Sequence, residues 1–372
     1  MKIICIAASR WNEMKQRPQH LMRELAQKHD ILYIEPAYDW SRAIKYRKNN
    51  KKWPKTFFQP IDGLKVFVPA MPISIRKYPS LNRKIRKMFF CRQVMKAIER
   101  FHFEDAVLWM HDIYAIEMLE FLPENPLIYD CCDEVAEFSS AYVDLARTNE
   151  EKLIKKASIV FTSAQNLYDR IKKQNTNTFL VRNGAEFERF YSNEGYQKNQ
   201  PKKKIVGFVG AISDWVNIEM IASAAKALPD IDFHMVGPIS TDVSLLKKME
   251  NVKFFGKQDY EKLPEFYHSF TVGIIPFRIN KLTLGVNPIK FYEYCAAGKP
   301  VVATSLPELE QYKPNIYCID TIEEFVSAIE KAIKEKNQSL YEASIEIAKE
   351  NSWAARAQAI DRFMDNVLMH RY

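Results

Sequence analysis

Short apolar segments alternate with longer amphipathic segments along almost the whole chain. The apolar segments are rich in β-formers, and a helix-sized interval or a loop separates each from the next. In the first half of the chain they are Ile3–Ala8, Ile31–Glu35, Leu64–Pro69, Ala106–Met110, Leu127–Tyr129, Ile159–Thr162 and Phe179–Arg182. This alternation predicts an α/β fold in which helices cover both faces of a parallel sheet.

The alternation breaks once and then restarts. Residues 191–204 are polar, lack apolar periodicity and contain Gly195 and Pro201, which is typical of a linker between domains. The later segments are a strand at Ile205–Val209, a helix at Trp215–Leu228, a strand at Asp232–Val236, then Val252–Phe255, Tyr260–Ser269, Val272–Pro276 and two final helices, Ser339–Glu350 and Trp353–Tyr372. Two successive α/β domains are therefore expected, at residues 1–190 and 203–350, with a cleft between them.

Residues 287–304 carry the most informative pattern of the chain. Pro288 suits the first turn of a helix, and Gly298 can take the left-handed conformation that ends it. Lys290 is expected near the positive end of this helix, with Glu293 three residues later. Such a pair can receive a phosphate and a sugar hydroxyl together. The alternative is a solvated Lys/Glu pair on an ordinary helix.

Other candidate ligand contacts follow strands of the second domain. Gly210 comes directly after Ile205–Val209, in a loop that also holds Ser213, and would let the backbone approach a phosphate. Gly237 ends the next strand, and Arg278 follows Val272–Pro276. Plain turns and an exposed arginine would explain these residues equally well. The loop is not a GxGxxG fingerprint, so a Rossmann dehydrogenase is not favoured.

In the first domain, Arg10 and Trp11 follow the first strand, and Arg17 opens the first helix. A guanidinium binds phosphate or carboxylate bidentately, so these residues are candidates for binding a second substrate.

His111, Asp112 and Asp133 follow two further strands of the first domain. A carboxylate at these positions could act as general base on an acceptor hydroxyl. The alternative is that the aspartates cap helices, which is a common position for this residue. Since no His/Cys cluster has ligand spacing, the sequence predicts no metal site. It also contains neither a phosphate-binding P-loop nor a nucleophile elbow.

Charge is unevenly distributed along the 372 residues. Residues 1–100 hold 23 basic and 7 acidic side chains, whereas residues 101–150 hold 1 basic and 12 acidic ones. The basic side chains of residues 42–58 and 76–100 are interleaved with Trp53, Phe57, Phe58, Phe89 and Phe90. This pattern fits an anionic membrane surface. A solvated basic face is the main alternative, and single-stranded nucleic acid is the least favoured.

The remaining composition points to a cytoplasmic protein at the inner face of the membrane. The apolar content of 47% excludes a disordered chain, and no apolar run reaches the length of a membrane span. The apolar N-terminus is short and fits a first strand better than a signal peptide. The six cysteines form no CxxC pair, which is typical of reduced core residues.

Taken together, these segments resemble the bacterial GT-B glycosyltransferases of the family-4 type, and among them the teichuronic-acid and exopolysaccharide enzymes. The resemblance spans nearly the whole chain. It is carried by Ser9-Arg-Trp11, Arg17-Pro-Gln-His-Leu21, Tyr129-Asp-Cys-Cys-Asp133, Val181-Arg-Asn-Gly184, Gly207-Phe-Val-Gly-Ala211 and, most specifically, residues 287–302, which begin Asn287-Pro-Ile-Lys290.

The resemblance implies two Rossmann-like α/β/α domains whose parallel sheets face a central cleft. It implies a nucleotide-sugar donor, with UDP favoured, bound mainly by the second domain through Glu293 on the ribose, Lys290 and the Gly210 loop on the diphosphate, and Asn287 nearby. The acceptor, a glycan or lipid-linked glycan of cell-surface polysaccharide synthesis, would bind the first domain. The helix Trp353–Tyr372 would cross back onto that domain. Neither a metal nor another cofactor would be required.

One position departs from the family pattern. Many family-4 enzymes carry a second glutamate eight residues before the first, and here that position is Gly285. Retaining chemistry is the family habit, but an inverting displacement that uses a first-domain aspartate stays open. The departure also leaves room for a non-catalytic scaffold in a polysaccharide synthesis complex. A nucleotide-sugar epimerase is a third possibility.

Overall fold

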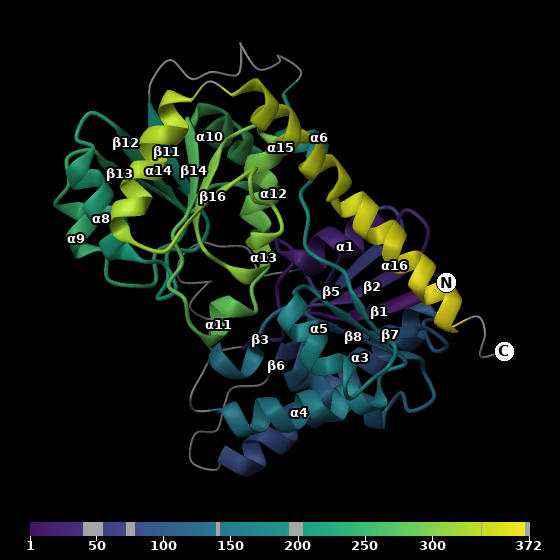
Figure 1. Ribbon diagram of the computed structural model, residues 1–372. Helices are drawn as coiled ribbons and strands as arrows, with labels where there is room; N and C mark the ends of the chain where they lie inside the picture. The colour runs from purple at the N-terminus through teal and green to yellow at the C-terminus, as the bar shows by residue number, and fades with distance from the viewer. Residues whose placement is uncertain (40–54, 72–78, 139–141, 193–203, 336, 369–372) are drawn as a thin grey trace. The chain divides into compact units, whose positions relative to one another are not determined.

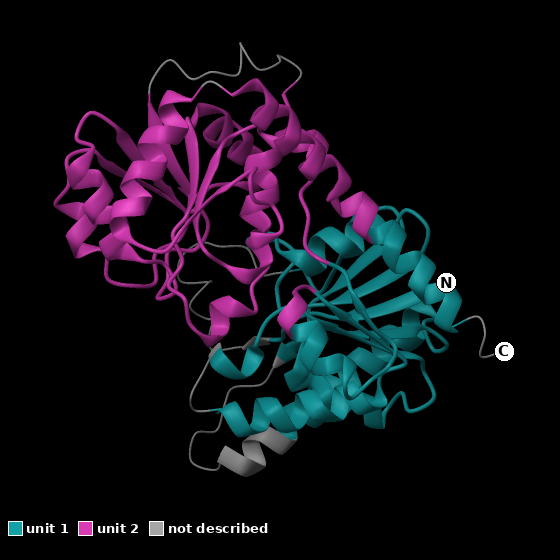
Figure 2. Cartoon of the chain, in the orientation of Figure 1, with its two compact units in different colours: residues 1–162, 167–181, 357–372 teal, residues 163–166, 182–356 magenta. Residues whose placement is uncertain are grey.

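The computed structural model describes residues 1–39, 55–71, 79–138, 142–192, 204–335 and 337–368. The chain divides into two compact units, coloured separately in Figure 2. Unit 1 comprises Met1–Thr162, Leu167–Val181 and Ala357–Tyr372, and unit 2 comprises Ser163–Asn166 and Arg182–Arg356. Each unit has its own sheet with helices on both faces, which confirms the predicted α/β fold class (Figure 1).

The sheet of unit 1 has, within the described residues, the strand order β10-β9-β8-β7-β1-β2-β5-β4. Its strands are β1 (Lys2–Ile6), β2 (Asp30–Ile34), β4 (Phe57–Ile61), β5 (Leu64–Phe67), β7 (Val107–Met110), β8 (Leu127–Cys131), β9 (Ile159–Thr162) and β10 (Thr178–Leu180). All neighbours pair in parallel except β4 and β5, which are antiparallel. Two short strands, β3 (Tyr38–Asp39) and β6 (Ala70–Met71), pair separately.

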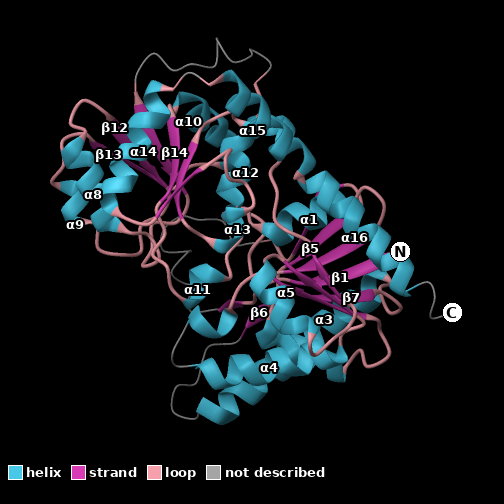
Figure 3. Ribbon diagram, viewed as in Figure 1, coloured by secondary structure: helices cyan, strands magenta, loops and turns pink. Residues whose placement is uncertain are grey.

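Helices cover both faces of this sheet. They are α1 (Arg17–Leu25), α3 (Pro79–Phe101), η1 (Ile113–Glu120), η2 (Val135–Phe138), α4 (Val143–Lys156), α5 (Gln165–Lys172) and α16 (Trp353–Leu368). In Figure 3, α1 and α16 lie on one side of the sheet, and α3 and α4 lie on the other. Because neither face meets water, strands such as β7 and β9 are buried along their whole length and have continuous apolar sequences.

The sheet of unit 2 is wholly parallel within the described residues, with the order β13-β12-β11-β14-β15-β16. Its strands are β11 (Ile205–Val209), β12 (Asp232–Val236), β13 (Val252–Gly256), β14 (Val272–Ile275), β15 (Val301–Thr304) and β16 (Tyr317–Ile319). In Figure 1, α8 (Ile218–Ala227) and α14 (Ile322–Lys334) cover one face. The other face carries α10 (Leu263–Ser269), α12 (Ile289–Ala296) and α15 (Gln338–Glu350).

Shorter helical segments complete unit 2. They are α6 (Phe187–Phe190), α9 (Ser244–Lys247), η4 (Tyr260–Lys262), α11 (Lys281–Leu284) and α13 (Pro307–Glu310). The helix start and end predicted within residues 287–304 are confirmed. α12 begins directly after Pro288, and Gly298 has φ of 64° just after the helix ends.

The chain passes from unit 1 into the long stretch of unit 2 after Val181, whereas the predicted first domain extended to residue 190. Residues 182–190 bond instead to unit 2. Arg182 Nε contacts Glu308 at 2.8 Å, and the Asn183 amide donates to Asn287 Oδ1 at 2.9 Å. His268 Nε2 lies 2.7 Å from the Phe190 carbonyl oxygen. Most of the predicted linker at 191–204 lies outside the described residues.

The last helix, α16, begins in unit 2 and continues into unit 1 from Ala357. The Asp361 carboxylate accepts a hydrogen bond from Lys28 Nζ at 3.1 Å and lies 2.9 Å from His29 Nε2. The Phe363 ring stacks on that of Phe179. The C-terminal end of the helix is thereby fixed on the first sheet. None of the helices in the described parts of the chain combines the length and apolar character that a membrane span requires.

Candidate functional site

Two glycines meet where β11 and β12 end in unit 2. Gly210 has φ of 142° and Gly237 has φ of 147°, a region that side chains rarely adopt. A Cβ added to Gly237 would lie 1.8 Å from the Gly210 carbonyl oxygen. The two loops can approach this closely only because Gly237 lacks a side chain. They meet at the carboxyl ends of the strands, where open α/β sheets bind ligands.

Lys290, in the first turn of α12, extends toward the Gly210 loop. Its Nζ would lie 3.2 Å from a Cβ built on Gly210, and it sits 4.9 Å from the ring centroid of Phe277 and 5.5 Å from that of Phe208. Burial lowers the pKa of Lys290 to about 8, although Glu293 opposes this shift. The ammonium is therefore charged at neutral pH and can complement a phosphate there.

Glu293 lies one turn further along α12 and is buried. Its Oε2 accepts a hydrogen bond from the Tyr267 phenol of α10, whereas Oε1 has no bonding partner among the described residues. Burial raises the pKa of Glu293 to about 7, and Tyr267 and Lys290 partly offset that rise. The carboxylate therefore has one oxygen held by the protein and one available to a hydroxyl ligand.

Of the other predicted donor contacts in unit 2, Asn287 is fully used by the protein itself. Its Oδ1 accepts from the Asn183 amide, and its Nδ2 donates to the Tyr292 hydroxyl at 3.1 Å and to Glu308 Oε2 at 2.9 Å. The Asn287 carbonyl also accepts from Asn183 Nδ2 at 2.7 Å. These bonds tie the chain after Val181 to the start of α12, so the geometry gives Asn287 a structural role.

The two remaining predicted donor residues bond to other side chains of the protein. Arg278 forms an exposed ion pair with Glu219. Ser213 is buried in the loop after Gly210, and its hydroxyl bonds to that of Ser240. The group that the structure brings together in unit 2 is therefore Gly210, Gly237, Lys290 and Glu293.

In unit 1, Arg17 is buried in an ion pair and not presented to a ligand. Its Nε donates to both oxygens of Asp130, at 3.0 and 3.2 Å, and its NH1 donates to the Val181 carbonyl at 2.7 Å. The side chain is 2% exposed. Its predicted substrate-binding role does not fit this geometry, because the guanidinium instead compensates a buried carboxylate at the end of β8.

Arg10 and Trp11, the other residues of unit 1 predicted to bind a substrate, also bond to the protein itself. Arg10 NH1 lies 3.5 Å from Glu35 Oε2, and its NH2 donates to the Ala37 carbonyl. Trp11 is buried edge-on against Tyr33, and its backbone amide donates to Glu35 Oε1 at 2.9 Å. These residues hold the chain after β1 against the chain after β2.

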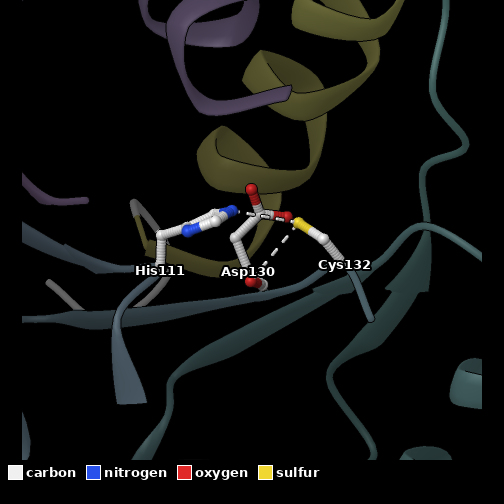
Figure 4. Close-up of side chains that lie close together, drawn as sticks. All are labelled: His111, Asp130 and Cys132. Carbon is white, nitrogen blue, oxygen red and sulfur yellow. Dashed lines mark hydrogen bonds between the residues drawn. The ribbon is translucent and has the colours of Figure 1, made fainter. Parts of the chain in front are cut away.

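His111, Asp130 and Cys132 lie together at the ends of β7 and β8, as Figure 4 shows. Their ligand-type atoms lie within 4.8 Å of one another, and Cys132 Sγ is 3.3 Å from His111 Nε2. Burial lowers the pKa of His111, which favours the neutral imidazole. Because Arg17 already bonds both Asp130 oxygens, its positive charge opposes a cation at this place.

The two predicted aspartate bases differ in their surroundings. Asp112 caps η1, since its Oδ1 accepts from the Tyr114 amide at 2.9 Å, and burial raises its pKa. Burial also raises the pKa of Asp133, to about 7, against the opposing effect of Arg17. Burial therefore biases both carboxyl groups toward the neutral form, and the pKa of Asp133 suits a group that exchanges a proton near neutral pH.

Sequence reasoning missed Tyr267 and Asp130, the partners of Glu293 and Arg17. Asp130 lies 113 residues from Arg17 and Tyr267 lies 26 residues from Glu293, so no local pattern marks either pair. The sequence shows that Asp130 lies at the end of a strand, but it does not show that Arg17 is its buried partner.

Comparison with known proteins bears first on unit 2. Residues 203–335 match the family of glycosyl transferases group 1. This stretch contains Gly210, Gly237, Lys290 and Glu293, the group described above.

A longer match extends beyond this stretch. The chain is 31% identical over 260 residues to TuaH of Bacillus subtilis (strain 168), a glycosyltransferase named for teichuronic acid biosynthesis. The match covers 62% of this chain and 64% of TuaH, which is less than two thirds of the relative's length.

Solved structures resemble the whole chain. Sucrose-phosphate synthase from Thermosynechococcus elongatus superposes with a TM-score of 0.77 at 13% identity and full coverage of both chains. HepE of Anabaena, in complex with UDP-glucose, gives 0.70 at 15% identity, covering 98% of this chain and 100% of its own. The E. coli protein of trehalose 6-phosphate synthesis, bound to UDP-2-fluoro glucose, gives 0.69 at 10% identity, with 98% and 99% covered. The chain thus has the GT-B fold, as predicted.

Proposed function

We propose that the protein is a glycosyltransferase that moves a sugar from a UDP-sugar to a glycan or lipid-linked acceptor in cell-surface polysaccharide synthesis. The observation that carries the proposal is the placement of Lys290 against the Gly210 loop, with Glu293 one turn later, inside the stretch that matches glycosyl transferases group 1. A nucleoside diphosphate needs positive charge at its phosphates and an acceptor for its ribose hydroxyls. The UDP complexes of HepE and the TuaH name support the donor and the pathway class.

In this reaction an acceptor hydroxyl oxygen forms a bond to the anomeric carbon of the donor sugar. The bond from that carbon to the diphosphate breaks, and its electron pair leaves on UDP. The Lys290 ammonium and the Gly210 loop stabilise the negative charge that develops on the leaving diphosphate. The hydroxyl proton passes to a base, for which Asp112 and Asp133 are the candidates in unit 1.

A titration of the purified protein with UDP and with GDP tests the proposal. A ligand at 100 times its Kd stabilises the folded state by about 2.7 kcal/mol, which raises the melting temperature measurably. Stabilisation by UDP and release of UDP from a UDP-sugar in solution are expected. A melting temperature that neither nucleotide changes would contradict the proposal.

The scaffold alternative has one observation in its favour. Gly285, which stands where many related enzymes carry a glutamate, ends α11 and offers no carboxylate near the sugar end of the site. A scaffold, however, has no use for Lys290 and Glu293. UDP stabilisation without any UDP release from a panel of UDP-sugars would favour the scaffold over the enzyme.

We also propose that unit 1 contacts an anionic membrane face through α3. Ile85, Met88 and Phe89 are exposed on this helix, among basic residues that include Arg92 and Lys96. Such a surface suits a bilayer with anionic headgroups. Phe57 does not belong to it, because its ring stacks on Phe67 inside the unit. The basic residues 42–54 lie outside the described part of the chain.

A further inference from the structure

Glu308 of α13 is a buried carboxylate whose oxygens bond to three segments distant in the sequence. The residue is 2% exposed. Its Oε1 accepts a hydrogen bond from the Gln165 amide at 2.6 Å. Its Oε2 accepts from Arg182 Nε at 2.8 Å and from Asn287 Nδ2 at 2.9 Å. Because a buried carboxylate is tolerated only where donors satisfy its oxygens, these three bonds account for a charge at this place.

Two of these partners stand beside points where the chain passes between its two units (Figure 2). The passages follow Thr162, Asn166, Val181 and Arg356. Gln165 lies in the short segment between the first two, and Arg182 is the first residue after the third. The fourth is linked to the same place, because Arg356 Nε donates to the Asn183 carbonyl at 3.2 Å. Segments next to all four passages therefore converge on Glu308 and its neighbours.

The third partner, Asn287, leads into α12. Its Oδ1 accepts from the Asn183 amide at 2.9 Å, and its carbonyl accepts from Asn183 Nδ2 at 2.7 Å. After Pro288 the helix begins, with Lys290 in its first turn. The place where the chain enters α12 is thus set by bonds from Glu308 and Asn183. The Glu308 network comprises Glu308, Gln165, Arg182, Asn183 and Asn287.

The two candidate ligand residues of α12 are held differently. Glu293 has a bond of its own from the Tyr267 phenol of α10. Lys290 Nζ lies over two aromatic rings, and none of the described residues accepts a hydrogen bond from it. The position of this ammonium against the Gly210 loop therefore depends on where α12 begins, which the Glu308 network fixes.

From these contacts we propose that Glu308 is a positioning residue of the nucleotide site. It fixes the start of α12 and, through it, the place of Lys290 against the Gly210 loop. Because coupling between two places is reciprocal in binding free energy, a nucleotide held by Lys290 steadies the Glu308 network in turn. The inference rests on the proposed glycosyltransferase function, which makes Lys290 a contact of the diphosphate.

Glu308→Gln tests this role, because an amide has one acceptor oxygen where the Glu308 network uses two. Its NH2 group would face either the Gln165 amide or the donors of Arg182 and Asn287, so one side must move apart. Calorimetric titration should show UDP binding at least fivefold weaker. Glu308→Asp keeps both acceptors and should recover part of the affinity. Glu310→Gln is the matched control, since Glu310 belongs to the same short helix and forms an exposed ion pair.

A double-mutant cycle separates positioning from a general loss of stability. In a Lys290→Met background, adding Glu308→Gln should weaken UDP binding less than twofold, because the lysine through which Glu308 acts is absent. Melting temperatures of the four proteins show whether each is folded during the titration. A loss of affinity that is equal in both backgrounds, or no loss in either, would overturn the inference.

Hydrogen exchange in the wild type tests the same link without a substitution. The amides of Gln165 and Asn183 donate into the Glu308 network, and saturating UDP should slow their exchange at least threefold. Mass spectrometry of peptides that contain these residues measures the change. Glu310→Gln should show the same slowing, and Glu308→Gln saturated with UDP should not. Unchanged exchange of both amides in the UDP-saturated wild type would overturn the inference, even if Glu308→Gln did not fold.

The UDP titration of the wild type separates this inference from the proposed function. If UDP binds and Glu308→Gln matches Glu310→Gln, the positioning role is wrong and the glycosyltransferase stands. If UDP does not bind the wild type, the proposed function fails, and the role of Glu308 fails with it.

Discussion

The Tyr267 phenol donates a hydrogen bond to Oε2 of Glu293, and both side chains are buried in unit 2. The bond fixes the orientation of the carboxylate and leaves Oε1 for a ligand. It also favours the ionised form of a group that burial pushes toward the neutral one. Under the proposed function, Tyr267 would be a positioning residue that acts on the nucleotide through Glu293.

Replacing Tyr267 by Phe should weaken UDP binding about tenfold, or about 1.4 kcal/mol, because a hydrogen bond to a charged group is lost. The ring and its packing against Phe190 stay in place. Calorimetric titration with UDP measures the change. Tyr317→Phe is the control, since Tyr317 makes a comparable bond to Glu335 at an exposed position of the same unit. Similar losses in both variants would argue against a positioning role.

UDP affinity should pass through a maximum between pH 7 and pH 8. Glu293 must be ionised to accept a ribose hydroxyl at Oε1 most strongly, and its pKa is raised to about 7, so affinity falls as the pH drops through 7. Lys290 must be protonated, and its pKa is lowered to about 8, so affinity falls as the pH rises through 8. Glu293→Gln should flatten the acid side of the curve of UDP affinity against pH, and Lys290→Met should flatten its alkaline side.

The titration of UDP itself is common to all three proteins and cancels when their pH profiles are compared. In Tyr267→Phe the acid limb should move to higher pH, because the bond that lowers the pKa of Glu293 is gone. Profiles of identical shape in the wild type and both charge variants would show that these two groups do not face the nucleotide.

Gly237→Ala should lower the melting temperature far more than Gly256→Ala. The new Cβ at residue 237 would collide with the Gly210 carbonyl at 1.8 Å, whereas nothing lies within 4 Å of one at residue 256. Both residues have positive φ, but 147° at Gly237 is less accessible to a side chain than 63° at Gly256, so the difference reports the collision together with the greater backbone strain. Equal shifts in differential scanning fluorimetry would mean that the two loops do not meet as described.

Binding to vesicles should require anionic lipid and weaken with salt, since charges near a surface are screened over about 8–10 Å in physiological buffer. Phe89→Ser should reduce binding severalfold, because an exposed ring of α3 is lost. Ile239→Ser, at a similarly exposed apolar position of unit 2, should not. Equal co-sedimentation with neutral and anionic vesicles, and of the wild type and Phe89→Ser, would contradict the membrane contact.

The apolar pattern was sufficient to predict most of the fold. The seven strands expected in the first half and those at Ile205–Val209 and Asp232–Val236 are present with small shifts at their ends, because a buried parallel strand is a continuous apolar run. Phe57–Ile61 was missed, since this edge strand is only half buried and pairs antiparallel to β5. Tyr317–Ile319 was also missed.

The site was predictable only where a local backbone signal marked it. Gly210, Gly298 and the Lys290/Glu293 spacing are properties of short segments, and all of them lie in the stretch that matches glycosyl transferases group 1. Arg17 looked equally suited to an anion, yet its anion is the buried carboxylate of Asp130, far away in the sequence. A charged residue's partner depends on tertiary packing, which spacing does not reveal.

The release of UDP from a UDP-sugar by the Lys290→Ala variant is the most direct test of the donor site. Lys281→Ala is the matched control, because Lys281 is an exposed lysine of α11 in the same unit. We expect the Lys290 variant to keep its melting temperature within a few degrees and to release UDP at least a hundredfold more slowly. The Lys281 variant should match the wild type in both measurements. Near-normal UDP release by Lys290→Ala would contradict the assignment of the diphosphate site.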